Sequence, residues 1–285
     1  MTTVAGDTAG RALIAARLLA LAGRMDVPVA IGEREALLRR RRFPIWGHEG
    51  KGLENLPAAP ISGEPAPECI VRMAREVPDL ELLAVGPMTN VARALALDPE
   101  LPARVGGLTV MGGHIRRAAI GSKVFAPGID YNLCSDPEAS VAVLGAGFRT
   151  TLIPADVTLE TWLRPQDVDA LASAGAVGSA LAAQIRVWDP IQRKLFTGLG
   201  GEVPADNVAF LHDPLTALAL IEPAPLHFET LQIVTTIERG VLRTLEVDRA
   251  AGLGTPMRVA TRVDALAAER AIVTRLTKGT SALSS

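Results

Sequence analysis

Several features that mark common classes of protein are missing from this chain. Its two cysteines, Cys69 and Cys134, lie far apart and form no C-x-x-C motif, so we expect neither a disulfide framework nor a zinc site. No apolar run approaches the roughly 20 residues that cross a bilayer, and the first residues lack the basic-then-apolar pattern of a signal peptide. Free thiols without a membrane segment favour a cytoplasmic protein.

The charge and the glycine pattern exclude further classes. The formal net charge is -2 and the sequence pI is about 6.1, so the chain lacks the positive field that draws proteins onto nucleic acid. It contains no G-x-G-x-x-G motif and no phosphate-binding loop, which leaves a generic nucleotide-binding α/β protein as an unsupported alternative. We therefore expect no nucleic acid and no membrane among its partners.

What the sequence does have is a regular alternation of short apolar runs and amphipathic stretches. The 285 residues are 48% hydrophobic, enough for one large core. Strands are expected over 1–5, 27–31, 80–85, 107–111, 150–154, 231–237 and 257–263. Helices are expected over 8–22 with Thr8 as N-cap, 66–75, 86–97, 136–144, 165–196 with a break at 189–190, 211–221 and 265–276. This rhythm predicts an α/β fold with a mainly parallel mixed sheet flanked by helices.

One stretch, GIDYNLCSDPEAS over 128–140, gathers polar residues ahead of a helix. Asp136-Pro137-Glu138 has the form of a helix start, with an acidic N-cap and proline at the first helical position. Asp130 and Asn132 would then lie in the loop before a helix N-terminus, the end that carries positive partial charge. Two interpretations stay open on these residues alone: a capped helix after a polar turn, or the floor of a binding site.

Five motifs taken in order give a more specific indication. They are TTVAGD at 2–7, VGPMTN at 85–90, VMGGHI at 110–115, DYNLCSDPEAS at 130–140 and HDPL at 212–215. In order and spacing the chain resembles the inosine-uridine-preferring nucleoside hydrolase family over nearly its whole length. The resemblance implies the nucleoside hydrolase fold with a Rossmann-like core, hydrolysis of the N-glycosidic bond of ribonucleosides to ribose and free base, a calcium ion, and a homodimer or homotetramer.

The resemblance also assigns residues to the nucleoside. Asn132 matches the ribose-binding asparagine, and Asp130 stands where glutamate is more common. Asp7 stands where asparagine is usual, and Trp46 replaces a histidine of the loop that covers the base. His212 is the candidate for protonating or orienting the leaving base, since imidazole titrates near neutral pH.

For the metal, the resemblance leaves few ligands. Asp213 matches a carboxylate ligand of calcium and Val85 matches a backbone-carbonyl ligand, but the chain has no Asp-x-Asp-Pro-Gly-x-Asp-Asp loop, because Met1 falls where the family's second strand is under way. We therefore expect one domain over 1–285 that is truncated at its N-terminus relative to the family and binds calcium weakly. The missing first strand would leave the edge of its neighbouring strand unpaired and apolar. The alternative function is a nucleoside-binding homologue that is catalytically impaired.

Overall fold

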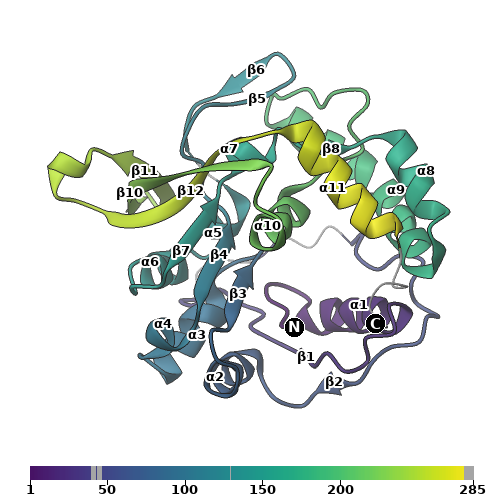
Figure 1. The fold of residues 1–285 in the computed structure, drawn as a ribbon, viewed down its shortest axis with the longest axis horizontal. Helices are drawn as coiled ribbons and strands as arrows, with labels where there is room; N and C mark the ends of the chain where they lie inside the picture. Colours follow the sequence, from purple (N-terminus) through teal and green to yellow (C-terminus); the bar gives the residue numbers. More distant parts are fainter. Residues whose placement is uncertain (40–42, 44–46, 129, 279–285) are drawn as a thin grey trace.

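The computed structural model describes residues 1–39, 43, 47–128 and 130–278 and has an α/β fold (Figure 1). Its main sheet has six strands in the order β11-β10-β12-β7-β4-β3. The strands are β3 (Glu81–Ala84), β4 (Gly107–Met111), β7 (Thr150–Ile153), β10 (Leu226–Glu238), β11 (Val241–Val247) and β12 (Thr255–Val263). From β3 to β12 the neighbours are parallel, and β10 pairs antiparallel with both β12 and β11. The predicted mixed, mainly parallel sheet is confirmed.

Helices cover both faces of this sheet. They are α1 (Thr8–Leu21), α2 (Ala66–Glu76), α3 (Thr89–Leu97), α4 (Leu101–Arg104), α5 (Tyr131–Ser135), α6 (Pro137–Leu144), α7 (Ala155–Thr158), α8 (Pro165–Ala172), α9 (Gly175–Gly198), α10 (His212–Ile221) and α11 (Ala265–Thr277), with a 3-10 turn at Arg249–Ala251. One apolar cluster lies between the sheet and α2, α3, α4 and α6. A second lies between the sheet and α7, α8, α10 and α11. None of the described helices is both long and apolar enough to cross a membrane.

The first residues lie in a separate layer. Met1–Gly6 runs beside residues 30–34, with Thr3 N 3.2 Å from Ala30 O and Ala5 N 2.8 Å from Glu33 O. The strand expected over 1–5 is reduced to a single parallel bridge between Thr2 and Ala30. Next to it, β1 (Val29–Ala30) pairs in parallel with β2 (Ile61–Ser62). In Figure 1 this layer and α1 lie below the main sheet.

The edge of the main sheet nearest to this layer is β3. Among the described residues β3 pairs only with β4, and the Leu83 side chain on this strand is 41% exposed. Exposed backbone donors and acceptors beside an apolar side chain make a strand edge prone to pairing with other chains. Among the described residues β3 is thus an edge strand with one exposed apolar side chain, and its link to a missing neighbouring strand stays a prediction.

Three local expectations need correction. The N-cap of α1 is Asp7 instead of Thr8, because the Asp7 carboxylate accepts the N–H of Gly10. The expected break at 189–190 is wrong, because α9 continues through Pro190. The proline removes one helical N–H donor. On either side of it the helix is held by Gln184, which accepts the N–H of Gly50, and by Gln192, which accepts the N–H of Phe210. Strand β11 was not expected, because the β10–β11 turn places arginine and glycine at positive φ where the usual signal is Asn-Gly or Asp-Gly.

The remaining small strands complete the connections. An antiparallel pair is formed by β5 (Ala118–Ile120) and β6 (Lys123–Phe125), and another by β8 (Trp162–Leu163) and β9 (Ala209–Phe210). The β8–β9 pair brings the end of α7 close in space to the start of α10, and next to this pair Leu211 N donates to Thr161 O at 3.0 Å. The β5–β6 pair follows β4 in the chain, and β8 follows β7 and α7.

Candidate functional site

The predicted sugar-binding residues lie at the carboxyl end of β4. Asp130 caps α5 by accepting the N–H of Leu133 at 2.9 Å. Asn132, inside α5, donates from Nδ2 to the carbonyl oxygen of Met111, the last residue of β4, at 3.1 Å. The two residues therefore begin a short helix and are not in the open loop that the sequence predicts. Residue 129, between the strand exit and α5, lies outside the described residues.

Two glycines after β4 make this close packing possible. A Cβ atom on Gly112 would lie 2.7 Å from Leu133 Cγ and 3.3 Å from Asp130 Oδ1. The next residue, Gly113, has a φ of +86°, in the region that disfavours side chains. The Gly112-Gly113 pair thus lets α5 approach the end of the strand and fixes where Asp130 and Asn132 lie.

Asp130 and Asn132 are both 9% exposed. Burial raises the pKa of the Asp130 carboxyl, against the opposing effect of the N–H groups of Leu133 and Gly113. Among the described residues the Oδ1 atom of Asn132 has no hydrogen-bond partner. A buried carboxyl beside an amide oxygen that is not bonded to protein offers acceptors to sugar hydroxyls.

His212 begins α10, which packs against β4. Its Nδ1 atom lies 2.6 Å from Thr158 Oγ1 at the end of α7, and its ring centroid is 5.6 Å from that of Phe210. Burial lowers the pKa of the imidazole to about 4, so the ring is neutral at pH 7. The sequence predicts that His212 protonates or orients the leaving base; a neutral ring is compatible with the second role, because it can donate or accept a hydrogen bond.

Asp213, the next residue, lies in the first turn of α10. Its side chain reaches solvent, yet surrounding protein restricts hydration and raises the pKa of its carboxyl to about 6. Within the described part of the chain the carboxylate has no hydrogen bond or ion pair, so its position at a helix N-terminus is its main stabilising influence.

The other predicted site residues are less tightly placed. The exposed Asp7 uses its carboxylate as the N-cap of α1, with Oδ1 3.1 Å from Gly10 N. Val85 directly follows β3, and a Cβ atom on Gly86 would lie 3.0 Å from Val4, which places the N-terminal layer beside the end of β3. Trp46 lies outside the described residues.

The calcium ligands that the sequence assigns are few. Calcium takes roughly six to eight oxygen ligands, whereas Asp213 and the Val85 carbonyl supply one carboxylate and one carbonyl. Within residues 1–39, 43, 47–128 and 130–278 no group of three or more His, Cys, Asp or Glu side chains could hold a metal ion. Asp213 and Val85 would therefore supply only part of a calcium coordination shell.

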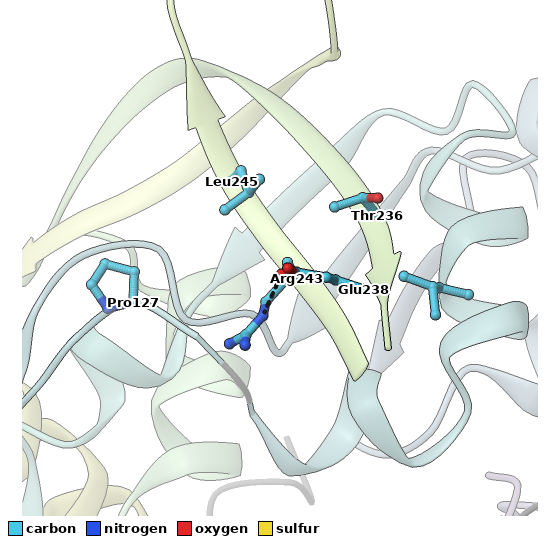
Figure 2. A pocket seen from close by; sticks show the side chains of 6 residues that line it. Pro127, Thr236, Glu238, Arg243 and Leu245 are labelled. Atoms are coloured by element: carbon cyan, nitrogen blue, oxygen red, sulfur yellow. Dashed lines mark ion pairs between the residues drawn. The ribbon is translucent and has the colours of Figure 1, made fainter. Parts of the chain in front are cut away.

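Two hollows lie away from these residues. One of about 450 Å³ lies against the β10–β11 hairpin and includes Pro127 and the Arg243–Glu238 ion pair, with its closest N···O distance at 3.7 Å (Figure 2). The other, of about 680 Å³, separates α1 from α9 and includes Trp188. Neither is lined by Asp130, Asn132, His212 or Asp213, so the candidate site rests on the side chains at the strand ends and not on the volume of a pocket.

Sequence reasoning missed two residues of α7. Asp156 accepts the N–H of Ile115 at 2.8 Å and so holds the turn after Gly112-Gly113. Thr158 contacts His212. A single sequence carried one weak signal for them, their position just after a strand of a parallel sheet, where binding residues gather.

Two curated proteins are similar to this chain in sequence. The chain is 32% identical over 220 residues to a probable uridine nucleosidase 2 of Arabidopsis thaliana, covering 74% of this chain and 64% of the plant protein. It is 31% identical over 230 residues to the pyrimidine-specific ribonucleoside hydrolase RihA of Klebsiella pneumoniae, covering 79% of this chain and 68% of RihA. The chain thus spans about two thirds of the length of these relatives.

Solved structures share the fold. A purine-preferring ribonucleoside hydrolase from Gardnerella vaginalis superposes with a TM-score of 0.81 at 23% identity, covering 97% of this chain and 88% of that one. A plant nucleoside hydrolase gives a TM-score of 0.79 at 24% identity, covering 95% and 86%. The family profile described as inosine-uridine preferring nucleoside hydrolase matches residues 1–270. The chain therefore belongs to the inosine-uridine preferring nucleoside hydrolase family.

Proposed function

We propose that this protein hydrolyses the N-glycosidic bond of ribonucleosides, giving ribose and a free base, in the cytoplasm and as a homodimer or homotetramer. One observation supports the proposal: Asn132 of α5 bonds the last residue of β4, and α10, which begins with His212-Asp213, packs against the same strand. Parallel sheets bind ligands at the carboxyl ends of their strands.

The proposed role of each residue follows from its chemistry and from the family resemblance. The ribosyl transition state is oxocarbenium-like, so the sugar must be held while positive charge develops on it. Asn132 offers amide groups and Asp130 offers a carboxyl to the ribose hydroxyls, with Asp7 as a further sugar contact. His212 offers a ring nitrogen to the departing base, and Trp46 is proposed to stack on it.

Calcium is the metal that family membership suggests, and Asp213 and Val85 would contribute to holding it. When bound, calcium would coordinate sugar hydroxyls and acidify a bound water. Because the described donors are so few, we propose that this chain binds calcium weakly. Calorimetry of the 1–285 chain should show no micromolar binding, and micromolar binding would contradict this part of the proposal.

The principal test is hydrolysis itself. The full chain is incubated with inosine and with uridine, with and without added calcium, and ribose and free base are measured chromatographically. Replacing His212 by alanine should slow purine nucleosides by about 100-fold or more, because the leaving base loses its hydrogen-bonding partner. The matched control is His227→Ala, which changes an exposed histidine on β10. An unchanged rate for His212→Ala would remove His212 from the mechanism.

The small donor set for a metal supports a second candidate, a nucleoside-binding homologue with impaired catalysis. In that case calorimetry would detect nucleoside binding, Asn132→Ala would weaken it, and no ribose would be released at any calcium concentration. Release of ribose by the wild-type chain, at a rate that falls in Asn132→Ala, would exclude this alternative.

A further inference from the structure

The contact between α7 and α10 joins residues 54 positions apart in the chain. Thr158 is completely buried, and its Oγ1 atom lies 2.6 Å from Nδ1 of His212. Its only other described acceptor is the carbonyl oxygen of Ala155 in the preceding turn, at 3.4 Å. The imidazole is therefore within strong hydrogen-bonding distance of a hydroxyl that water does not reach.

The position of one proton decides what His212 presents to a ligand. A threonine hydroxyl has a single proton, and the nearer acceptor here is Nδ1, by 2.6 Å against 3.4 Å. If the hydroxyl donates to Nδ1, that nitrogen carries no proton, and a neutral ring then has its proton on Nε2. The His212 side chain is only partly buried, and among the described residues its Nε2 atom has no recorded hydrogen bond to protein.

We propose that Thr158 is a positioning residue that holds His212 as the Nε2–H tautomer, so that Nε2–H donates a hydrogen bond to the departing base. The inference rests on the hydrolysis proposed above and defines its substrate class: bases with a ring nitrogen or carbonyl oxygen that accepts this bond. The opposite tautomer would present a lone pair to the same acceptor and repel it. The Phe210 ring, 5.6 Å away, further limits rotation of the imidazole.

The reaction balances without a proton leaving His212. The bond between C1′ of the ribose and the base nitrogen breaks, and both electrons leave with the base. The oxygen of a water molecule forms the new bond to C1′, and a proton of that water ends on the base. Donation from Nε2–H stabilises the negative charge that develops on the base as the bond breaks.

The first experiment does not depend on activity. Long-range ¹H–¹⁵N correlation spectra of the full chain distinguish a protonated from an unprotonated imidazole nitrogen, and His212→Ala assigns the His212 signals among the four histidines of the chain. We expect the wild type to carry its proton on Nε2, and Thr158→Val to give a mixture of tautomers. A wild type protonated on Nδ1, or an unchanged tautomer in Thr158→Val, would overturn the proposal.

The second experiment separates positioning from folding. Thr158→Val should lower kcat for nucleosides roughly tenfold to hundredfold with little change in KM, and Thr158→Ser should restore it. Turnover of a nitrophenyl riboside should be nearly unaffected, because nitrophenolate leaves without a hydrogen bond. The matched control is Thr161→Val, which changes a second completely buried threonine that donates to Thr158 O and has no bond to His212.

The outcomes keep the two proposals apart. Equal losses on both substrates, or an equal loss in Thr161→Val, would mean that Thr158 has only a structural role. Failure of the wild-type chain to hydrolyse either substrate would contradict the proposed function, while the tautomer measurement would still decide the role of Thr158.

Discussion

Two regions of this molecule are held together in different ways. The sheet body, residues 66–128 and 130–278, is joined by backbone ladders between six strands and by two large apolar clusters. The N-terminal layer, residues 1–39 and 47–62, has small clusters of its own, such as the one formed by Ala12, Ala16, Val29 and Ala59. The stabilising free energy of apolar burial grows with the area buried, so the small clusters stabilise the layer less than the two large clusters stabilise the body.

Side chains of the sheet body compensate by reaching into the layer. Asp136 Oδ2 accepts the N–H of Leu37 at 2.7 Å, and Asn90 bonds both Thr3 O and Glu33 N. Gln184 of α9 bonds Gly50 N and Lys51 O in the same manner. The proposed sugar-binding residues Asp130 and Asn132 lie in the body, whereas Asp7 lies in the layer. A few polar side chains of the body therefore set where the layer lies relative to the proposed sugar site.

The largest effect should come from Asp136→Ala. The completely buried Asp136 carboxylate also accepts from Thr89 Oγ1 at 2.6 Å and Ala139 N at 3.3 Å. Its loss leaves several buried donors without partners, so the free energy of unfolding should fall by about 3–5 kcal/mol in urea denaturation. As a control, Asp264→Ala removes an exposed cap of α11 and should cost only about 1 kcal/mol. Similar losses in both variants would mean that Asp136 acts as a cap alone.

Asn90→Ala should have a smaller and more local effect. Asn90 Nδ2 lies 2.8 Å from Thr3 O and Oδ1 lies 2.9 Å from Glu33 N, so both bonds join the body to the layer. We expect a loss of about 2 kcal/mol in the free energy of unfolding. Hydrogen exchange should quicken at Ala5 and Gly6 but remain slow in β4, because local opening frees the layer first. Uniform acceleration across both regions would contradict the division into layer and body.

The sequence predicted the sheet body well because its signals there are local. The apolar runs at 107–111 and 150–154 became β4 and β7, and Asp136-Pro137 marked the start of α6. It also pointed to Asp130 and Asn132, through a family resemblance instead of through periodicity. Strand and cap signals depend on neighbouring residues, so one sequence is enough to find them.

Contacts between distant residues were not predictable in this way. The sequence identifies Asp136 as a cap, but its bonds to Leu37 and Thr89 depend on how the chain folds back. Likewise Thr158 has no motif of its own, and only the packing of α7 against α10 brings it to His212. The neutral state of that imidazole follows from burial, which composition does not reveal.

The Asp213→Asn variant should have a higher free energy of unfolding than the wild type at neutral pH. The pKa of Asp213 is raised to about 6 in the folded chain, so below that pH the folded state binds more protons than the unfolded state. The free energy of unfolding of the wild type should therefore fall as the pH rises from about 4 to about 6 and then level off. Because this carboxylate still reaches water, the gain in Asp213→Asn should be about 1 kcal/mol above pH 6 and should vanish near pH 4. A gain that is independent of pH would contradict ionisation of Asp213 as its cause.

The smallest effect concerns strain in the N-terminal layer. Ala5 is 1% exposed, and its backbone has a φ of +70°, just before the turn that leads to Asp7. A left-handed alanine costs roughly 1–2 kcal/mol, whereas glycine there costs roughly 0.5–1 kcal/mol in chain entropy. Ala5→Gly should therefore raise the free energy of unfolding by about 0.5 kcal/mol in urea denaturation. Ala36→Gly is the matched control, since Ala36 packs in the same small cluster and is not among the positive-φ residues, so the variant should be destabilised. Equal destabilisation by both would show that the contacts of the Ala5 methyl group outweigh its backbone strain.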